Sequence, residues 1–419
     1  MILNFYRKIS NLLIPFILLF FLYRLLNLKE TLESFKQKFG FYTFKKPKKE
    51  IIWLHAVSIG ESLSMISVIK ELNKSKRFKV LLTTSTITSA KIIKDRYSDL
   101  LIHQFAPIDI PIIINKFLNY WNPKISIFSE SELWPNLLLL IKKKNIKLFL
   151  LNGRMSKNTF SNWSRFPKTS KKILESFDLS FIQDSKSLKR FQRLGLENTK
   201  HTGNLKFLSD KPPISKKEYK EFRRNLEGKF IICLCSSHKG EEKIIIQIFK
   251  NLIKKKTNLF LIIIPRHIHR REEIEKIIFE NRLNHILRSK KSKFGGSNCM
   301  LADTFGEVGL FLKLSNLVLM GGTFVKKGGQ NPIEGYFFKC PTIIGPYYEN
   351  FDDVVNILKK NKAIISVSNL ERLTKVIEDL IRNKKDRLQI GNNLYNACLK
   401  ERKRNLKILK IINETIYQL

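Results

Sequence analysis

The stretch IIWLHAVSIGESLSMISVIKELNK (Ile51–Lys74) decides the fold of this chain. It begins with a short apolar, β-branched run, and after Gly60 the apolar residues recur at the spacing of a helix. A strand, a tight turn and a helix in this order form the repeating unit of parallel α/β sheets. Glu61 directly follows the turn glycine in a chain of formal net charge +41, so the position of this carboxylate needs an explanation.

The same alternation continues along the chain. It predicts further strands over 79–85, 125–130, 147–153 and 179–184, and, after a pause at Leu208–Phe222, over 229–237, 258–267, 284–289, 317–322 and 341–346. A terminal helical segment is expected over Asp386–Leu419. The sequence therefore predicts an α/β protein of two doubly wound, Rossmann-like halves joined near residue 212, which face each other across a ligand-binding cleft.

Composition restricts the classes of partner. The 77 Lys and Arg against 36 Asp and Glu favour anions: nucleic acid, acidic lipid headgroups or phosphorylated substrates. Abundant Lys, Ile, Asn and Phe are also typical of drift toward AT-rich codons, which would leave much of the charge on solvated faces. Nucleic-acid binding is disfavoured because the positive residues are spread over the whole chain and no recognition motif is present. Five cysteines, an odd number in apolar runs, indicate reduced thiols.

The N-terminal segment is unusually apolar. Asn11–Leu26 is uncharged except at Arg24, and no small-residue cleavage site follows it. Pro15 is expected to kink a helix here, and Arg24 can reach toward lipid headgroups. We interpret residues 1–30 as a membrane anchor, with a buried first helix as the alternative. Residues 31–212 and 213–419 are then the two domains, the second including the closing C-terminal helices.

Three loops of the first half carry candidate chemistry. Glu61 can accept a proton from an attacking hydroxyl or merely complement the dipole of its helix. In SESELWPN, one of Glu130 and Glu132 is expected to form a structural salt bridge and the other to face the cleft. In TGNLKF, Lys206 suits a phosphate or a carboxylate, unless it is one more solvated lysine.

The second half offers an anion-binding pattern. SSHKGEE (Ser236–Glu242) lies between a strand and a helix, and Arg266 ends the strand IIIPRH. In DTFGEVG, Thr304 is a candidate helix cap. The stretch Met320–Gly335 ends in Asn331-Pro332-Ile333-Glu334, which has the spacing of a capping box; a glycine-rich turn before a helix also holds nucleotide phosphates. The two halves together predict a nucleotide-dependent enzyme.

These stretches resemble a known family. HAVSIGE, ESELWPN, TGNLKF, SSHKGEE, PRH, DTFGEVGLF and GGQNPIE occur in the order seen in the bacterial transferases of 3-deoxy-D-manno-octulosonic acid (Kdo). The resemblance covers nearly the whole chain. It implies a GT-B glycosyltransferase whose first domain handles a lipid A precursor (lipid IVA) and whose second binds CMP-Kdo, at the cytoplasmic face of the inner membrane, in lipopolysaccharide core biosynthesis.

The resemblance also implies residue roles. Glu61 matches the general base, and Glu130 and Lys206 match positions that stabilise the transition state. The donor contacts correspond to Pro265, Arg266, Phe305, Gly306, Glu307, Asn331, Pro332, Ile333 and Glu334. No metal or other cofactor is expected, and the partners are CMP-Kdo, the lipid acceptor and an anionic membrane surface rather than nucleic acid. Gln330 stands where relatives usually have histidine, and TTSTITSA lacks the usual Pro and Gly, which bears on donor affinity.

One direct displacement then gives inversion at the anomeric carbon, with Glu61 deprotonating the acceptor hydroxyl as CMP leaves. A GT-B enzyme that uses a UDP-sugar and a non-lipid acceptor is the alternative, and competition between CMP and UDP distinguishes the two.

Overall fold

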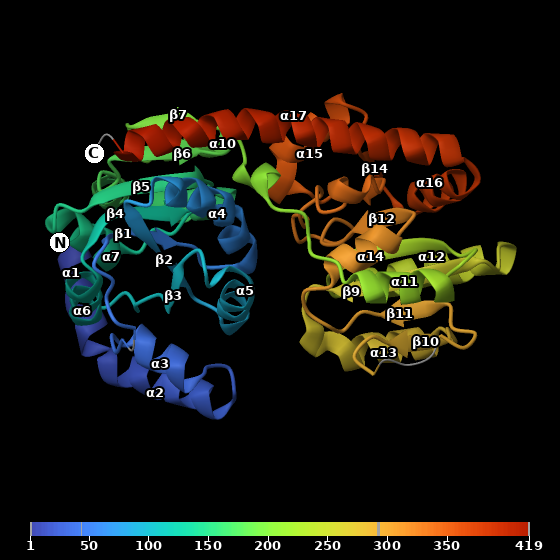
Figure 1. The fold of residues 1–419 in the computed structure, drawn as a ribbon, viewed down its shortest axis with the longest axis horizontal. Helices are drawn as coiled ribbons and strands as arrows, with labels where there is room; N and C mark the ends of the chain where they lie inside the picture. Colours follow the sequence, from blue (N-terminus) through green and yellow to red (C-terminus); the bar gives the residue numbers. More distant parts are fainter. Residues whose placement is uncertain (1, 43, 291–293, 418–419) are drawn as a thin grey trace. The chain divides into compact units, whose positions relative to one another are not determined.

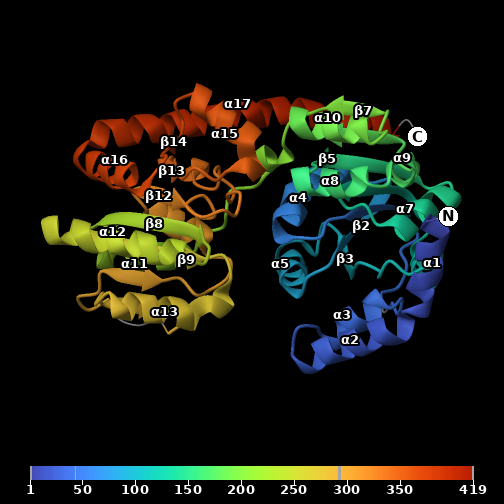
Figure 2. The same ribbon diagram turned by 180° about the vertical axis from the view of Figure 1, so that it is seen from behind.

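The chain forms two compact units in the computed structural model, which describes residues 2–42, 44–290 and 294–417. Unit 1 consists of Met1–Asp210 and Lys403–Leu419, and unit 2 of Lys211–Arg402. Each unit contains one parallel sheet with helices packed on it, and the elements are labelled in Figure 1 and seen from behind in Figure 2. The predicted fold class, two parallel α/β sheets, is confirmed, and the cleft between them stays a prediction.

Unit 1 is built on a seven-stranded sheet of order β3-β2-β1-β4-β5-β6-β7. The strands are β1 (Glu50–His55), β2 (Phe78–Thr84), β3 (Ile102–Phe105), β4 (Pro123–Ser129), β5 (Lys147–Gly153), β6 (Leu179–Ile182) and β7 (Thr199–His201). The chain order reverses between β1 and β4, which are parallel neighbours. Loops that follow these two strands therefore meet at one edge of the sheet, where α/β proteins bind ligands.

Alternate residues of the strands enter two different cores. Ile51 and Trp53 of β1 pack with helices α6, α7, α9 and α10, and Ile52 and Leu54 pack with α4 and α5 on the other face. A strand covered on both faces must be apolar at every position, which is why the predicted strands show no alternation of polar residues. The helices after the N-terminal segment are α4 (Ile59–Leu72), η1 (Asn73–Ser75), α5 (Ile87–Tyr97), α6 (Pro111–Trp121), α7 (Pro135–Lys143), α8 (Lys157–Ser164), α9 (Pro167–Leu174), α10 (Ser185–Arg193) and η2 (Leu205–Leu208).

Unit 2 repeats this plan with the order β10-β11-β9-β8-β12-β13-β14. Its strands are β8 (Phe230–Ser237), β9 (Leu259–Pro265), β10 (His285–Leu287), β11 (Cys299–Leu301), β12 (Leu317–Met320), β13 (Thr342–Ile344) and β14 (Ile365–Ser366). Its helices are α11 (Lys216–Asn225), α12 (Glu241–Lys255), η3 (Ile268–Arg270), α13 (Arg271–Glu280), α14 (Val308–Leu314), η4 (Tyr336–Phe338), η5 (Glu349–Phe351), α15 (Asp352–Lys360), α16 (Leu370–Arg382) and the first part of α17 (Lys384–Tyr417).

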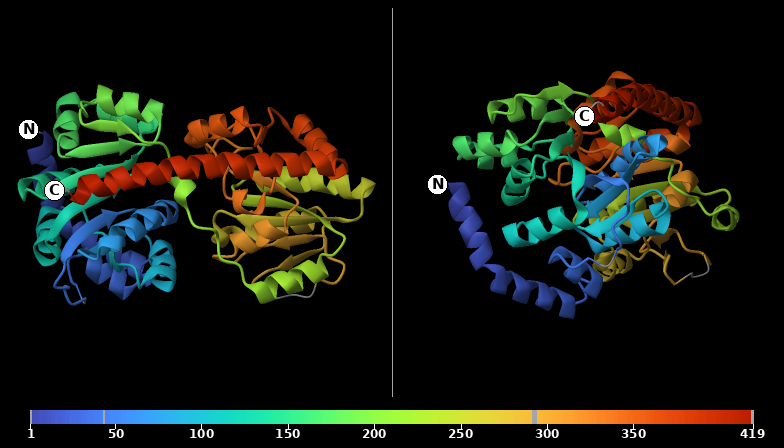
Figure 3. Two further views of the ribbon diagram at one scale, coloured as in Figure 1. Left: turned by 45° about the horizontal axis from the view of Figure 1, so that its top comes forward. Right: turned by 60° about the vertical axis from the view of Figure 1, so that its left-hand side comes forward.

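The C-terminal helix α17 differs from the expectation that residues 213–419 all belong to the second domain. This helix, the long red one in Figure 3, starts in unit 2, but its last part belongs to unit 1. Leu409, Ile412 and Ile416 are buried in the same core as Ile52 and Leu54 of β1. The burial of these three apolar side chains explains why the chain returns to the first sheet.

The N-terminal segment forms α1 (Ile2–Leu12), α2 (Ile14–Leu26) and α3 (Leu32–Lys38). Within the described residues no single helix is long and apolar enough to cross a membrane, but α1 and α2 pass that test as a pair bent by 56°. The bend is visible at the N-terminal end of the chain in Figure 3. Pro15 stands in the first turn of α2, so the expected break falls where this proline begins a new helix.

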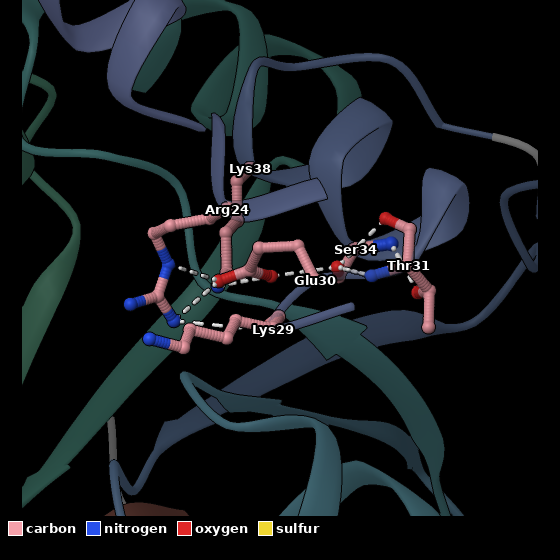
Figure 4. Close-up of polar contacts among 6 residues, drawn as sticks. All are labelled: Arg24, Lys29, Glu30, Thr31, Ser34 and Lys38. Carbon is pink, nitrogen blue, oxygen red and sulfur yellow. Dashed lines mark hydrogen bonds and ion pairs between the residues drawn. The ribbon is translucent and has the colours of Figure 1, made fainter. Parts of the chain in front are cut away.

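Polar contacts fix α1 to the rest of unit 1 and join α2 to α3. The Tyr6 hydroxyl of α1 donates to Asp109 at 2.9 Å. Beyond α2, the Glu30 carboxylate accepts from Lys38 Nζ at 2.8 and 2.9 Å and from Arg24, and Ser34 donates to it at 2.7 Å (Figure 4). Glu30 and Lys38 are buried as a pair, so removing Glu30 would leave the buried Lys38 charge uncompensated.

Candidate active site

Glu61 lies in the first turn of α4, directly after the loop that follows β1. Ser58 is the N-cap of α4, and Glu61 lies three residues later, in the first turn. Its carboxylate accepts from Ser58 Oγ at 2.7 Å, from Val57 N at 3.0 Å and from Ser129 Oγ, at the end of β4, at 3.0 Å. The residue is 9% exposed. Glu61 thus bonds to the N-cap of its own helix, and it also links the loop after β1 to the end of the neighbouring strand β4.

The environment of Glu61 increases the affinity of its carboxylate for a proton. Burial and the negative charge of Glu130 raise its pKa, and the three hydrogen bonds only partly oppose this. A base with a raised pKa is a better proton acceptor near neutral pH than an ordinary carboxylate. The geometry is therefore suited to general-base chemistry.

Glu130 and Lys206 form an ion pair beside Glu61. Lys206 Nζ lies 2.9 Å from Glu130 Oε1, and the two side chains are 17% and 14% exposed. Glu130 directly follows β4 with a positive φ of 53°, and Lys206 lies in the 3-10 helix η2, whose N-cap Asn204 accepts from the Lys206 amide. Of the two carboxylates expected to divide the roles, Glu130 is the one that pairs with a cation.

Glu132 is the third carboxylate of this cluster. It accepts from Trp134 Nε1 at 2.6 Å, and its Oε2 lies 4.0 Å from Nε2 of His55. Burial raises its pKa to about 7, helped by the charges of Glu61 and Glu130 and opposed by the Trp134 bond. His55 itself is buried, which lowers its pKa to about 4 and keeps the ring neutral at pH 7. One positive and three acidic groups therefore share the carboxyl edge of the first sheet.

In unit 2 the predicted donor residues follow adjacent strands. The strands β11, β9, β8 and β12 are neighbours in this order. At their carboxyl ends lie, in the same order, the loop before α14, the Pro265-Arg266 pair, the SSHKGEE loop and the Met320–Gly335 stretch. Arg266 N donates to Ser237 O at 3.0 Å, and the Arg266 charge acts on Glu334. The structure thus gathers these residues as the parallel topology predicts.

The Asn331–Glu334 motif does not begin an α-helix, contrary to its capping-box spacing. Turn residues 332–335 lead instead into η4. Asn331 Oδ1 is buried and has no hydrogen-bond partner within the described residues. The Glu334 carboxylate turns away from its own backbone and accepts from the Cys235 thiol of β8 at 3.4 Å. The capping-box interpretation was wrong: no α-helix follows the motif, and the Glu334 carboxylate accepts from Cys235 rather than from the backbone amide of Asn331.

Burial leaves the Glu334 carboxylate poorly solvated and raises its pKa, although the Cys235 bond and the Arg266 charge oppose the shift. Together, Glu334 and Asn331 offer acceptor oxygens that the described residues do not saturate. Such groups are suited to hydroxyl or amino donors of a ligand.

The SSHKGEE loop also differs from its expected role. The backbone amides of His238, Gly322 and Phe324 all donate to the Glu241 carboxylate, at 2.8, 2.7 and 2.9 Å. These donors are occupied by the chain's own acid, so they do not form an open anion site. Gln330 is the residue that departs from the family pattern. Its Nε2 atom lies 2.9 Å from Nε2 of His238.

The loop before α14 holds the remaining predicted donor residues. Phe305 is 62% exposed, and Gly306 has a φ of +82°, which turns the chain sharply. Glu307 directly precedes α14, and its carboxylate binds Arg288 at 3.0 Å. Thr304 does not cap the helix as expected, because its hydroxyl donates to Glu307 instead.

Several residues of these sites escaped the sequence analysis. Ser58 and Ser129 fix Glu61. Ser58 stands three residues before Glu61, the spacing of a capping box, and this spacing could have indicated the contact. Ser129 carries no such signal. Cys235 and Arg288 lie in or just after strands, where nothing in the sequence indicates a polar partner.

Comparison with known proteins agrees with this arrangement. The family model for 3-deoxy-D-manno-octulosonic-acid transferase (kdotransferase) matches residues 33–209. The chain is 32% identical over 406 residues to the 3-deoxy-D-manno-octulosonic acid transferase of Rickettsia bellii, covering 96% of each chain. It is 29% identical over 385 residues to the enzyme of the same name from Haemophilus influenzae, covering 90% of each chain.

Solved structures show the fold. A glycosyltransferase from Rickettsia africae has a TM-score of 0.60 at 12% identity, covering 88% of this chain and 99% of that one. The Anabaena protein HepE in complex with UDP and glucose has a TM-score of 0.61 at 12% identity, covering 88% and 100%. The two successive Rossmann-like units thus correspond to the expected GT-B class, and the long match to the Rickettsia bellii enzyme decides the family. The chain belongs to the 3-deoxy-D-manno-octulosonic acid transferases, a family of glycosyltransferases.

Proposed function

We propose that the protein transfers Kdo from CMP-Kdo to a hydroxyl of the lipid A precursor lipid IVA, with inversion, in lipopolysaccharide core biosynthesis. The observation that carries this proposal is the buried Glu61 carboxylate, held by three donors beside the Glu130–Lys206 ion pair. Its raised pKa suits a general base.

In the proposed reaction Glu61 takes the proton of the acceptor hydroxyl. The oxygen forms a bond to the anomeric carbon of Kdo as the bond from that carbon to the CMP phosphate breaks, and CMP leaves with the electron pair. Lys206 offsets negative charge near Glu61, which otherwise would oppose the approach of an anionic sugar. The reaction needs no metal, because basic side chains suffice to hold the leaving phosphate.

For the donor we propose binding in unit 2. Arg266 suits the phosphate, and Glu334 suits the two ribose hydroxyls, since its carboxylate receives a hydrogen bond from one weak thiol donor within the described residues. Phe305, Gly306, Pro332 and Ile333 would shape the rest of the site. This assignment rests on the resemblance together with the unsaturated acceptors of Asn331 and Glu334.

Calorimetric titration with CMP, UMP and UDP tests the proposed donor. CMP is expected to bind more tightly than UMP or UDP, and Glu334→Gln is expected to weaken CMP binding by about tenfold, because a carboxylate accepts two hydroxyl bonds where an amide oxygen accepts them less strongly. Preference for UDP would instead support a UDP-sugar enzyme.

The pH dependence of kcat/KM follows from the carboxylate cluster. Only ionised Glu61 accepts a proton, so activity is expected to rise with pH along an acid limb centred above the ordinary glutamate value of 4.5. In Glu130→Gln the limb is expected to move to lower pH, because the negative neighbour that raises the pKa of Glu61 is gone. A wild-type limb at or below the ordinary value would contradict the assignment of the base.

For localisation we propose that the α1–α2 pair embeds in the cytoplasmic face of the inner membrane. Phe16 and Leu19 on α2 and Leu26 at its end are 68%, 63% and 83% exposed. Tyr6 of α1 is bonded to Asp109, and Arg24 of α2 to Glu30, which pairs with Lys38 of α3. A segment lying along the bilayer keeps these contacts.

Flotation with anionic vesicles tests this attachment. The double variant Phe16→Ser, Leu19→Ser is expected to lose most vesicle binding, because it removes apolar surface from the exposed face. The matched control Phe279→Ser, at a position 78% exposed in unit 2, is expected to bind as the wild type does. Equal binding of the double variant would contradict attachment through the Phe16 and Leu19 face of α2.

A further inference from the structure

Glu307, one of the residues assigned to the donor, has its carboxylate occupied by the protein. Arg288 Nε donates to both carboxylate oxygens, at 3.0 and 3.1 Å, and Arg288 Nη2 donates to Oε1. The Thr304 hydroxyl donates to Oε2. A carboxylate offers about four acceptor positions, so these contacts use most of them.

The neighbour of Arg288 holds the other end of the same loop, Asp303–Glu307, which we call the donor loop. Ser289 N and Ser289 Oγ donate to the two oxygens of Asp303 at 2.8 and 2.6 Å. Two consecutive residues after β10 therefore hold the acids at the start and the end of the donor loop. Between these acids lie Thr304, the exposed Phe305 and Gly306.

Arg288 is itself fixed by its surroundings. Its side chain is 10% exposed, its guanidinium carbon lies 5.2 Å from the ring centre of Phe222, and its Nη2 also pairs with Glu218 of α11. Its backbone amide donates to Leu301 O at 3.0 Å, which continues the pairing of β10 with β11. An arginine with this many partners presents its planar fork to Glu307 in one orientation.

The segment that enters unit 2 packs closely behind the donor loop. A Cβ at Gly309, in the first turn of α14, would lie 2.6 Å from Cβ of Pro212 and 3.1 Å from O of Pro213. The start of α14 is therefore packed tightly against Pro212 and Pro213. The donor loop is confined by this packing behind α14 and by Arg288 and Ser289 at its two ends.

We propose that Arg288 is a positioning residue for donor binding: it holds the Glu307 carboxylate so that the backbone of the donor loop and the Phe305 ring, rather than that carboxylate, contact the nucleotide. This inference rests on the proposed function, since it takes the donor loop to be part of the CMP site. Arg288 touches no reacting atom in this scheme, so its loss affects donor binding and leaves the chemical step intact.

The test measures CMP binding by calorimetry and KM for CMP-Kdo in the full-length protein. Arg288→Gln is expected to raise the Kd for CMP and the KM for CMP-Kdo by about tenfold or more. This is the loss typical of a bidentate charged hydrogen bond. The kcat at saturating donor is expected to stay unchanged. Arg288→Lys, which keeps the charge without the fork, is expected to fall between Arg288→Gln and the wild type. The matched control Arg282→Gln removes an exposed arginine just before β10 and is expected to bind CMP normally.

A double-mutant cycle with Glu307→Gln separates the proposal from its rival. If Arg288 acts through Glu307, the two substitutions are non-additive, and the double variant binds CMP about as weakly as either single one. If Glu307→Gln weakens CMP binding while Arg288→Gln does not, Glu307 contacts the nucleotide directly and the proposal is wrong. Lower thermal stability of Arg288→Gln with normal CMP binding would also overturn it.

Two further outcomes are informative. If Arg288→Gln does not fold, Arg288→Lys decides the question, because normal CMP binding by that variant contradicts a need for the fork. If the wild-type protein binds no CMP, the donor assignment itself fails, which is distinct from failure of the Arg288 contact alone.

Discussion

Replacing Glu61 with glutamine is expected to lower kcat by about 10²–10⁴-fold while CMP binding stays at the wild-type level. Glutamine keeps the size of the side chain and one acceptor oxygen for the Ser58, Val57 and Ser129 donors, but it cannot take up a proton. The loss is confined to the chemical step because the proposed donor residues lie in unit 2.

Steady-state transfer with calorimetric CMP titration measures both parts of this prediction. Glu71→Gln is a matched control, since Glu71 lies on the same helix and pairs with Lys74. Thermal unfolding checks that both variants are folded. Near-normal turnover by folded Glu61→Gln would exclude Glu61 as the base.

The second large effect is expected for Lys206→Gln. We expect kcat to fall by about 10²–10³-fold, because a preorganised charge beside the reacting groups is lost. The acid limb of the pH–rate profile is also expected to move to higher pH. Without the ammonium group, the charge of Glu130 acts on Glu61 uncompensated, and a nearby negative charge raises the pKa of a carboxylate.

A pH–rate profile of this variant checks both claims in one experiment. Lys70→Gln is the control, because Lys70 also forms an ion pair in unit 1, with Asp210 at 2.6 Å, but its side chain is 46% exposed. An exposed pair of this kind contributes about 0–1 kcal/mol to stability. An unshifted limb and a normal kcat for Lys206→Gln would show that the Glu130–Lys206 pair is structural.

Much of each sheet was predictable from the sequence. Strands buried on both faces are continuous apolar runs, so KLFLLNG (147–153) and the run that becomes β9 stand out. Strand β7 was not predicted, because its three residues, Thr199–His201, include no apolar side chain. Parallel topology then brings the motif loops to one edge of each sheet.

Side-chain partners were less predictable. Nothing local indicates that Glu241 accepts from the amides of its own loop and of Gly322, or that Glu334 turns toward Cys235. Likewise, the apolar face of α17 indicates that it packs on something but not on which unit. These outcomes depend on contacts between residues far apart in the chain, which spacing does not encode.

The most direct test of the account is a mass-resolved transfer assay with detergent-extracted protein, CMP-Kdo and lipid IVA. We expect a product heavier than lipid IVA by one or more Kdo residues, formed by the wild type and absent with Glu61→Gln that still binds CMP. No product from folded wild-type protein that binds CMP, or equal product from Glu61→Gln, would contradict it.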